Sequence, residues 1–236
     1  MSNLHPHTQM PNHPFKYYDL FAVLSAAILI ASNVTAQKMV PVGPLVMSAA
    51  IIMFPLTYVV GDIMTEVYGY ARARRVTWTS VGCMAFVTIL YQATIAMPHI
   101  TEWPNQEAFK AVLGNTPRLV AASITAIMAG ELINSFVLAK MKIWTQGKHL
   151  WARFVASTFV GQGVDSLLFF PLAFYGVLPN DMLLTAALSG WLLKTLYEAL
   201  MAPFTTLLVR CLKKIEEVDF YDYTTNFNPF KLDVDE

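Results

Sequence analysis

The sequence predicts an all-α membrane protein in which six transmembrane helices form one bundle. Of its 236 residues, 56% are hydrophobic and only 14% are charged, whereas a soluble domain carries roughly 25% charged residues. Six stretches are apolar and long enough to cross the hydrocarbon core, which takes about 20 helical residues. The formal net charge of zero excludes a basic nucleic-acid-binding protein. Two cysteines are too few for a disulfide framework.

The expected spans leave a short polar segment at each end of the chain. A polar cytoplasmic leader covers residues 1–15, and residues 215–236 form an acidic cytoplasmic tail that we expect to be solvated. Residues 98–116, with Trp103 and Phe109, are expected to form a short helix lying in the membrane interface. The transmembrane domain covers residues 16–214, with spans at about 18–38, 43–68, 76–97, 117–139, 152–177 and 183–210.

Basic residues are distributed unevenly between the two sets of loops. Only Lys38, Lys110 and Arg118 fall on one set. The other set is much richer, and cytoplasmic loops carry the excess of Lys and Arg. This bias predicts that both termini lie in the cytoplasm. The richer set consists of Arg72, Arg74, Arg75, Lys140, Lys142, Lys148, Arg153, Arg210, Lys213 and Lys214.

Ionisable residues inside the spans are the main functional signal. A charge at the bilayer centre costs about 2.5–3.5 kcal/mol on the insertion scale, so these groups must face the bundle interior, pair or be protonated. Residues four apart share a helix face, which places polar stripes on five of the six spans. We expect the stripes to converge on one internal cavity whose excess negative charge would be neutralised by a cationic or donor-rich ligand or by protons. The stripes contain Asn33 and Gln37; Asp62 and Glu66; Glu131 and Asn134; Gln162, Asp165 and Phe169; and Lys194 and Glu198.

Each stripe also has a purely structural interpretation. Lys194 and Glu198 could form an intrahelical clamp as well as a ligand site. Glu66 is expected to be a partner of the arginines that follow span two rather than a ligand-binding group. Asn33 and Gln37 could act as hydrogen-bonding groups between helices. Glu131 and Asp165 are harder to explain in this way, because neither has a basic residue on its own helix face.

The same survey excludes several kinds of chemistry. All five histidines lie outside the expected spans, and no HExxH, GxSxG or Walker sequence occurs. No span carries a ladder of arginines typical of a voltage sensor. The sequence therefore predicts a protein that is not an enzyme, with no catalytic residues, no cofactor and no metal site.

Four segments together resemble one family. They are SNVTAQK (32–38), FPLTYVVGDIMTEVYGYARARR (54–75), GQGVDSLLFF (161–170) and LKTLYEALMAP (193–203). They are similar to the queuosine precursor transporter family, also called the vitamin uptake transporter family, in the same order and on the same spans. The second segment is the most specific, because Asp62, Glu66, Tyr68 and Gly69 followed by basic residues make a long composite pattern.

The resemblance implies a multi-pass bacterial inner-membrane protein that imports deazaguanine precursors of queuosine, in cyano- or aminomethyl-substituted form or as the queuine base. It also implies a fold similar to the substrate-binding subunits of energy-coupling-factor transporters. Two other functions stay open: such a binding subunit, dependent on an external ATPase, and a membrane-embedded assembly factor. A homo-oligomer is possible. The stripes and the resemblance together give the expected substrate-binding set: Asn33, Gln37, Asp62, Glu131, Gln162, Asp165, Phe169, Lys194 and Glu198.

Overall fold

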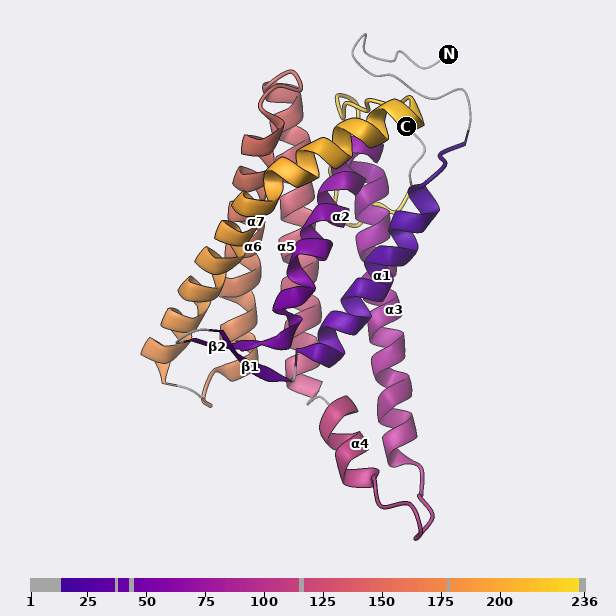
Figure 1. Ribbon diagram of the computed structural model, residues 1–236, viewed down its shortest axis with the longest axis vertical. Helices are drawn as coiled ribbons and strands as arrows, with labels where there is room; N and C mark the ends of the chain where they lie inside the picture. Colours follow the sequence, from indigo (N-terminus) through magenta and orange to yellow (C-terminus); the bar gives the residue numbers. More distant parts are fainter. Residues whose placement is uncertain (1–13, 37, 43–44, 115–116, 178, 234–236) are drawn as a thin grey trace.

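The computed structural model describes residues 14–36, 38–42, 45–114, 117–177 and 179–233. Its long helices lie side by side in one bundle, and the start of α1 and the C-terminal segment lie at the same end of it (Figure 1). The elements in chain order are α1 (Tyr18–Thr35), β1 (Met39–Val42), β2 (Leu45–Ser48), the 3-10 helix η1 (Ala49–Ile52), α2 (Phe54–Tyr68), α3 (Tyr70–Ala96), α4 (Gln106–Leu113), α5 (Pro117–Trp144), α6 (Leu150–Phe174) and α7 (Asn180–Glu216).

The predicted class, a helical membrane protein, is confirmed. Five segments are long and apolar enough to cross a membrane: α1, α3, α6, α7 and the segment Gln106–Trp144, which contains α5. The expected first, third, fourth, fifth and sixth spans each coincide with one long helix. Within the expected outer segment 98–116, α4 is confirmed as a helix, and the Trp103 and Phe109 rings meet edge to face with centroids 5.9 Å apart.

The second crossing differs from the expected helix over 43–68. Strands β1 and β2 pair antiparallel, with Met39 opposite Ser48 and Val42 opposite Leu45. The α-helix proper begins only at Phe54 and has 15 residues. At 1.5 Å per residue it is about 22 Å long, short of the ~30 Å hydrocarbon core. The sequence Pro41-Val42-Gly43-Pro44 explains the difference, because proline and glycine interrupt helices and mark turns.

Helix α2 is the centre of the bundle. It packs against α1, α3, α5 and α7, and from Tyr58 to Ala71 every residue except Gly61 is buried. Gly69 ends the helix with φ +88°, a conformation that side chains other than that of glycine rarely adopt. A Cβ atom at this position would collide with the ring of Phe220. The polar residues of α2 are therefore enclosed by four other helices.

The expectation of a solvated C-terminal tail is wrong for the described residues 217–233. Val218 and Phe220 belong to the hydrophobic core. The Asp222 carboxylate accepts a hydrogen bond from the backbone N–H of Tyr70 at 3.0 Å, at the start of α3. Arg74 donates to the carbonyls of Asn226 and Asn228 at 2.6 and 2.9 Å. The acidic composition gave no sign of these contacts. They form because the acids and carbonyls of the segment pair with the basic residues at this end of the bundle.

Candidate functional site

Four acidic side chains from four helices gather around the middle of α2. They are Asp62 on α2, Glu131 on α5, Asp165 on α6 and Glu198 on α7. Glu131 lies within electrostatic range of both Asp165 and Glu198, and Asp62 lies against Glu198. Asp62 and Glu198 each have 0% of their surface exposed. The structure thus brings together the four carboxylates that the helical spacing predicted to meet.

One of these carboxylates has a basic partner on a neighbouring helix. The Lys194 Nζ atom of α7 lies 2.5 Å from Asp165 Oδ2 of α6. Lys194 is therefore an interhelical partner that ties α7 to α6. The expected intrahelical clamp would instead have joined it to Glu198, whose two oxygens accept no hydrogen bond within the described residues.

Several polar atoms in this region are buried without a hydrogen-bond partner among the described residues. They include one oxygen of Asp62, the side-chain oxygen of Asn134 and both oxygens of Glu198. The other end of the Asn134 amide does have a partner, because its Nδ2 donates to Asp62 Oδ1 at 3.4 Å. An unsatisfied buried polar group costs about 1–3 kcal/mol, more if charged. Such a concentration indicates a place where the protein binds protons or a polar ligand.

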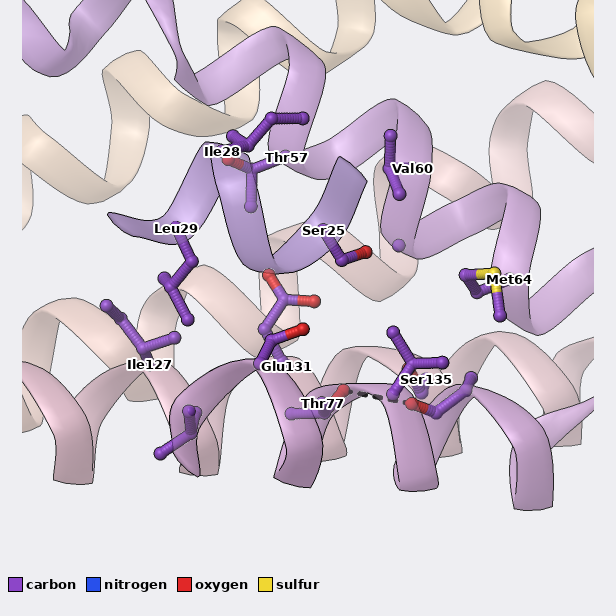
Figure 2. Close-up of a pocket in the computed structure, with 15 residues that line it drawn as sticks. Ser25, Ile28, Leu29, Thr57, Val60, Met64, Thr77, Ile127, Glu131 and Ser135 are labelled. Carbon is purple, nitrogen blue, oxygen red and sulfur yellow. Dashed lines mark hydrogen bonds between the residues drawn. The ribbon is translucent and has the colours of Figure 1, made fainter. Parts of the chain in front are cut away.

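A cavity of about 50 Å³ borders this region. It lies between α1, α2, α3 and α5, and Glu131 is its acidic lining residue (Figure 2). Hydroxyl groups of Ser25, Thr57, Thr77 and Ser135 also line it, and the rest of the lining is mostly apolar. A cavity of this volume holds water molecules, whereas ligand pockets are typically about 300–1,000 Å³. The described conformation is therefore closed around its polar centre.

Glycines allow α5 and α6 to approach closely beside the acidic residues. A Cβ atom on Gly161 would lie 2.7 Å from the Cβ of Asn134 and 2.8 Å from the carbonyl oxygen of Gly130. A Cβ atom on Gly130 would lie 2.8 Å from the Cβ of Asp165. These distances are too short for real side chains, so the two glycines set the separation of the helices that carry Asn134 and Asp165.

Replacing Gly161 by alanine is expected to destabilise the protein by about 1–3 kcal/mol, the usual cost of overpacking. The matched control is Gly82→Ala on α3, where a Cβ atom would meet nothing within 4 Å. That substitution should be neutral or slightly stabilising, because alanine favours helix more than glycine does. Melting temperatures of the purified proteins in detergent test this, and equal effects of the two substitutions would contradict the close approach.

The remaining predicted site residues are placed less centrally or lie outside the description. Asn33 lines a second cavity of about 10 Å³ with apolar and hydroxyl residues of α1, α3 and α4, none of them acidic. Gln162 is buried on α6. The Phe169 ring packs edge to face against Phe170, with centroids 5.4 Å apart. Gln37 lies outside the described residues.

Glu66 is the centre of an ion-pair network that sequence reasoning assigned incorrectly. Its expected partners were the arginines after span two. Instead its carboxylate contacts Arg153 Nη1 of α6 and Lys213 Nζ of α7, each at 2.6 Å, and Lys142 Nζ of α5 at 3.4 Å. Asp219 completes the network at 2.8 Å from Lys142 and 2.7 Å from Lys213. The signal that could have revealed it is the recurrence of basic residues at the same end of spans four, five and six.

Comparisons with known proteins show which family this chain belongs to. A family model described as "Putative vitamin uptake transporter" matches residues 48–208, more than half of the chain. The protein belongs to this family. The resemblance drawn from the four sequence segments is thereby confirmed, and so is the prediction of a transporter rather than an enzyme.

One curated relative of this vitamin uptake transporter family member comes from Bacillus subtilis (strain 168). It is named "Probable queuosine precursor transporter" and is 24% identical over 176 residues, which cover 74% of this chain and 77% of the relative. No solved structure matches the chain. The similarity to energy-coupling-factor subunits consequently stays a prediction.

Proposed function

We propose that this transporter imports deazaguanine precursors of queuosine, such as the cyano- and aminomethyl-substituted bases, across the bacterial inner membrane. The observation that carries the proposal is the meeting of Asp62, Glu131, Asp165 and Glu198 inside the bundle, where Glu131 lines a cavity. The printed name of the Bacillus subtilis relative supports the substrate class. Membership of a transporter family supports transport as the activity.

The chemistry of the substrate matches the chemistry of the site. A guanine-like edge presents a ring N–H and an amino group, which one carboxylate can accept as a pair of charge-assisted hydrogen bonds. Glu131 and Asp165 are our candidates for this contact. Gln162 or Lys194 would donate to the carbonyl of the base, and Phe169 would stack against its ring. A protonated aminomethyl group would offset the excess of acids.

Binding requires a conformation more open than the described one. The cavity of about 50 Å³ beside Glu131 is far smaller than the roughly 300 Å³ at the lower end of small-molecule pockets. We infer that α1 and α2 separate from α5 to admit the base. The Lys194–Asp165 pair would meanwhile hold α6 and α7 together as one unit.

The proposed orientation places both termini in the cytoplasm. The basic residues Lys142, Arg153 and Lys213 meet at the end of the bundle that also holds the C-terminal segment. Because cytoplasmic ends carry the excess of Lys and Arg, this end would face the cytoplasm. Cysteine labelling from either side of the membrane tests the orientation directly.

The substrate assignment is tested with Glu131→Gln and Asp165→Asn. Cyano-deazaguanine should stabilise the purified wild-type protein against heat and should be taken up by liposomes that contain this chain alone. Each substitution should weaken binding about 10- to 150-fold, because a hydrogen bond to a charged group contributes about 1.5–3 kcal/mol. Glu107→Gln, at an exposed position of α4, should leave binding unchanged.

Three results would contradict parts of this proposal. Normal binding and uptake by both variants would exclude Glu131 and Asp165 as the recognition groups. Stabilisation without uptake would favour a binding subunit that needs a separate ATPase. Absence of saturable binding by any deazaguanine would exclude the substrate class.

A further inference from the structure

The contact between Asp62 and Glu198 is not explained by recognition of a base. Asp62 is on α2 and Glu198 is on α7, and the two carboxyl groups lie against each other with 0% of either residue exposed. Helices α2 and α7 pack directly on each other. The cavity beside Glu131 is lined by neither of the two residues. This pair is therefore a separate polar feature at a helix–helix contact.

Three of the four oxygens of the pair are left without donors among the described residues. Within the described part of the chain, both oxygens of Glu198 and the Oδ2 atom of Asp62 accept no hydrogen bond from an N–H or hydroxyl group. Asn134 approaches from α5, and 3% of its surface is exposed. It donates to the other Asp62 oxygen, while its own side-chain oxygen has no donor. A buried amide oxygen without a donor next to the pair adds to the negative potential there.

Two buried carboxylates in contact cannot both remain ionised, because each disfavours the charge on the other and burial disfavours both charges. One proton held between them removes one charge and supplies the missing donor. The two groups then titrate as a unit rather than as separate acids. The aspartic-protease dyad is the standard example of such sharing.

We propose that Asp62 and Glu198 form a proton-binding pair that holds one proton while α2 and α7 are packed together, and that import is coupled to this proton. The coupling rests on the proposed function, because it assumes that the helices separate to move substrate. When the helices separate toward the outside, the pair takes up its proton as the substrate enters; when they separate toward the cytoplasm, water reaches the carboxylates and the proton leaves with the substrate. Proton binding is thereby linked to the closed conformation, and by reciprocity the proton concentration biases that conformation.

The groups around the pair favour this assignment. Glu131 of α5 lies within electrostatic range of both members and Tyr58 of α2 lies within range of Glu198; neither residue carries a positive charge. Lys194 of α7 lies within electrostatic range of Glu131, and its ammonium group is bound to Asp165 of α6. The pair is thus surrounded mainly by acidic and neutral groups, which favour retention of a proton.

The site itself is tested without any substrate. Infrared spectra of the purified protein in detergent should show the carbonyl band of a protonated carboxylic acid at neutral pH, which disappears as the pH rises. The folded state should bind one proton more than the unfolded state, so the melting temperature should fall over the same pH range. Asp62→Asn and Glu198→Gln, neutral analogues of the protonated acids, should each lose the band and flatten the pH dependence. If both variants keep the wild-type band and pH profile, the proton-binding pair is excluded.

The coupling is tested in liposomes with the membrane potential held at zero. With cyano-deazaguanine, a neutral base, a gradient of one pH unit (alkaline inside) should accumulate substrate about tenfold, since one unit corresponds to a tenfold ratio of protons. Glu198→Gln should only equilibrate the substrate, and Glu107→Gln should accumulate it like the wild type. Accumulation that follows sodium instead of pH, or equilibration by the wild type, would overturn the coupling. Failure to move any deazaguanine would instead refute the proposed function. The infrared titration would still show whether Asp62 and Glu198 hold a proton.

Discussion

Replacing Glu66 by glutamine is expected to lower the free energy of unfolding by about 3–5 kcal/mol, because removing one partner leaves buried charges uncompensated. Arg153 and Lys142 are each buried, and both contact the Glu66 carboxylate. Lys213 is its third basic partner. Without Glu66, Asp219 is the acid that remains in the network, and it pairs with only two of the three cations. The amide has nearly the same shape as the carboxylate, so the effect reports charge rather than packing.

Denaturation of the purified protein in detergent measures this change, with Glu107→Gln as the control at an exposed acid. A second variant isolates the electrostatic origin. Combining Glu66→Gln with Lys213→Met leaves two cations, Lys142 and Arg153, beside Asp219 instead of three, which lowers the uncompensated positive charge. The double variant should therefore be more stable than Glu66→Gln alone. If the loss of stability in the double variant equals the sum of the losses in Glu66→Gln and in Lys213→Met, then Glu66 and Lys213 do not interact.

The sequence predicted the long helices well because hydropathy over 20 residues is a strong and local signal. The second crossing was the exception. The run over residues 43–52 is as apolar as a span, so hydropathy alone joined it to α2. Pro41, Gly43 and Pro44 carried the contrary signal, since they mark turns. The paired strands could have been predicted by giving these residues more weight than mean hydropathy.

The candidate site was predictable in its members but not in its pairings. Helical spacing placed Asp62, Glu131, Asp165 and Glu198 on inward faces, and the structure brings them together. Which acidic residue pairs with a given basic residue depends on the rotation of each helix about its axis, and no local sequence pattern encodes that rotation. Lys194 therefore binds Asp165 on another helix instead of forming the predicted pair one turn away. Asn33 likewise lines a different cavity, against α3, in the described conformation.

The C-terminal segment was misjudged because composition hides single apolar residues. Seven acids in 22 residues are typical of a solvated tail, yet Val218 and Phe220 between them reach the core. Opposite charges lie at the same end of the bundle, where Lys142 and Lys213 bind Asp219. An acidic segment beside a basic surface is therefore drawn onto it, and its few apolar residues then fix its position.

Phe220→Ala is expected to cost about 3–5 kcal/mol, the usual effect of removing a buried phenylalanine ring. The residue is 7% exposed, and its ring covers Gly69 at the break between α2 and α3. The Arg72 guanidinium lies 5.4 Å from the ring centroid, a cation–π contact that alanine also removes. The backbone carbonyl of Phe220, which accepts a hydrogen bond from Lys142 Nζ at 2.7 Å, is kept in this variant. The loss is therefore a property of the ring alone.

Phe230→Ala is the matched control in the same segment, because Phe230 is 72% exposed. Its ring lies against Trp78, with centroids 6.0 Å apart. Because Phe230 is so exposed, its removal should cost less than about 1 kcal/mol, as for most surface substitutions. Limited proteolysis gives a second measurement, since loss of the Phe220 anchor should free residues 217–233 and expose them to cleavage while the helices stay protected. If Phe220→Ala and Phe230→Ala melt at the same temperature and are cleaved at the same rate, the segment does not hold the helix ends together.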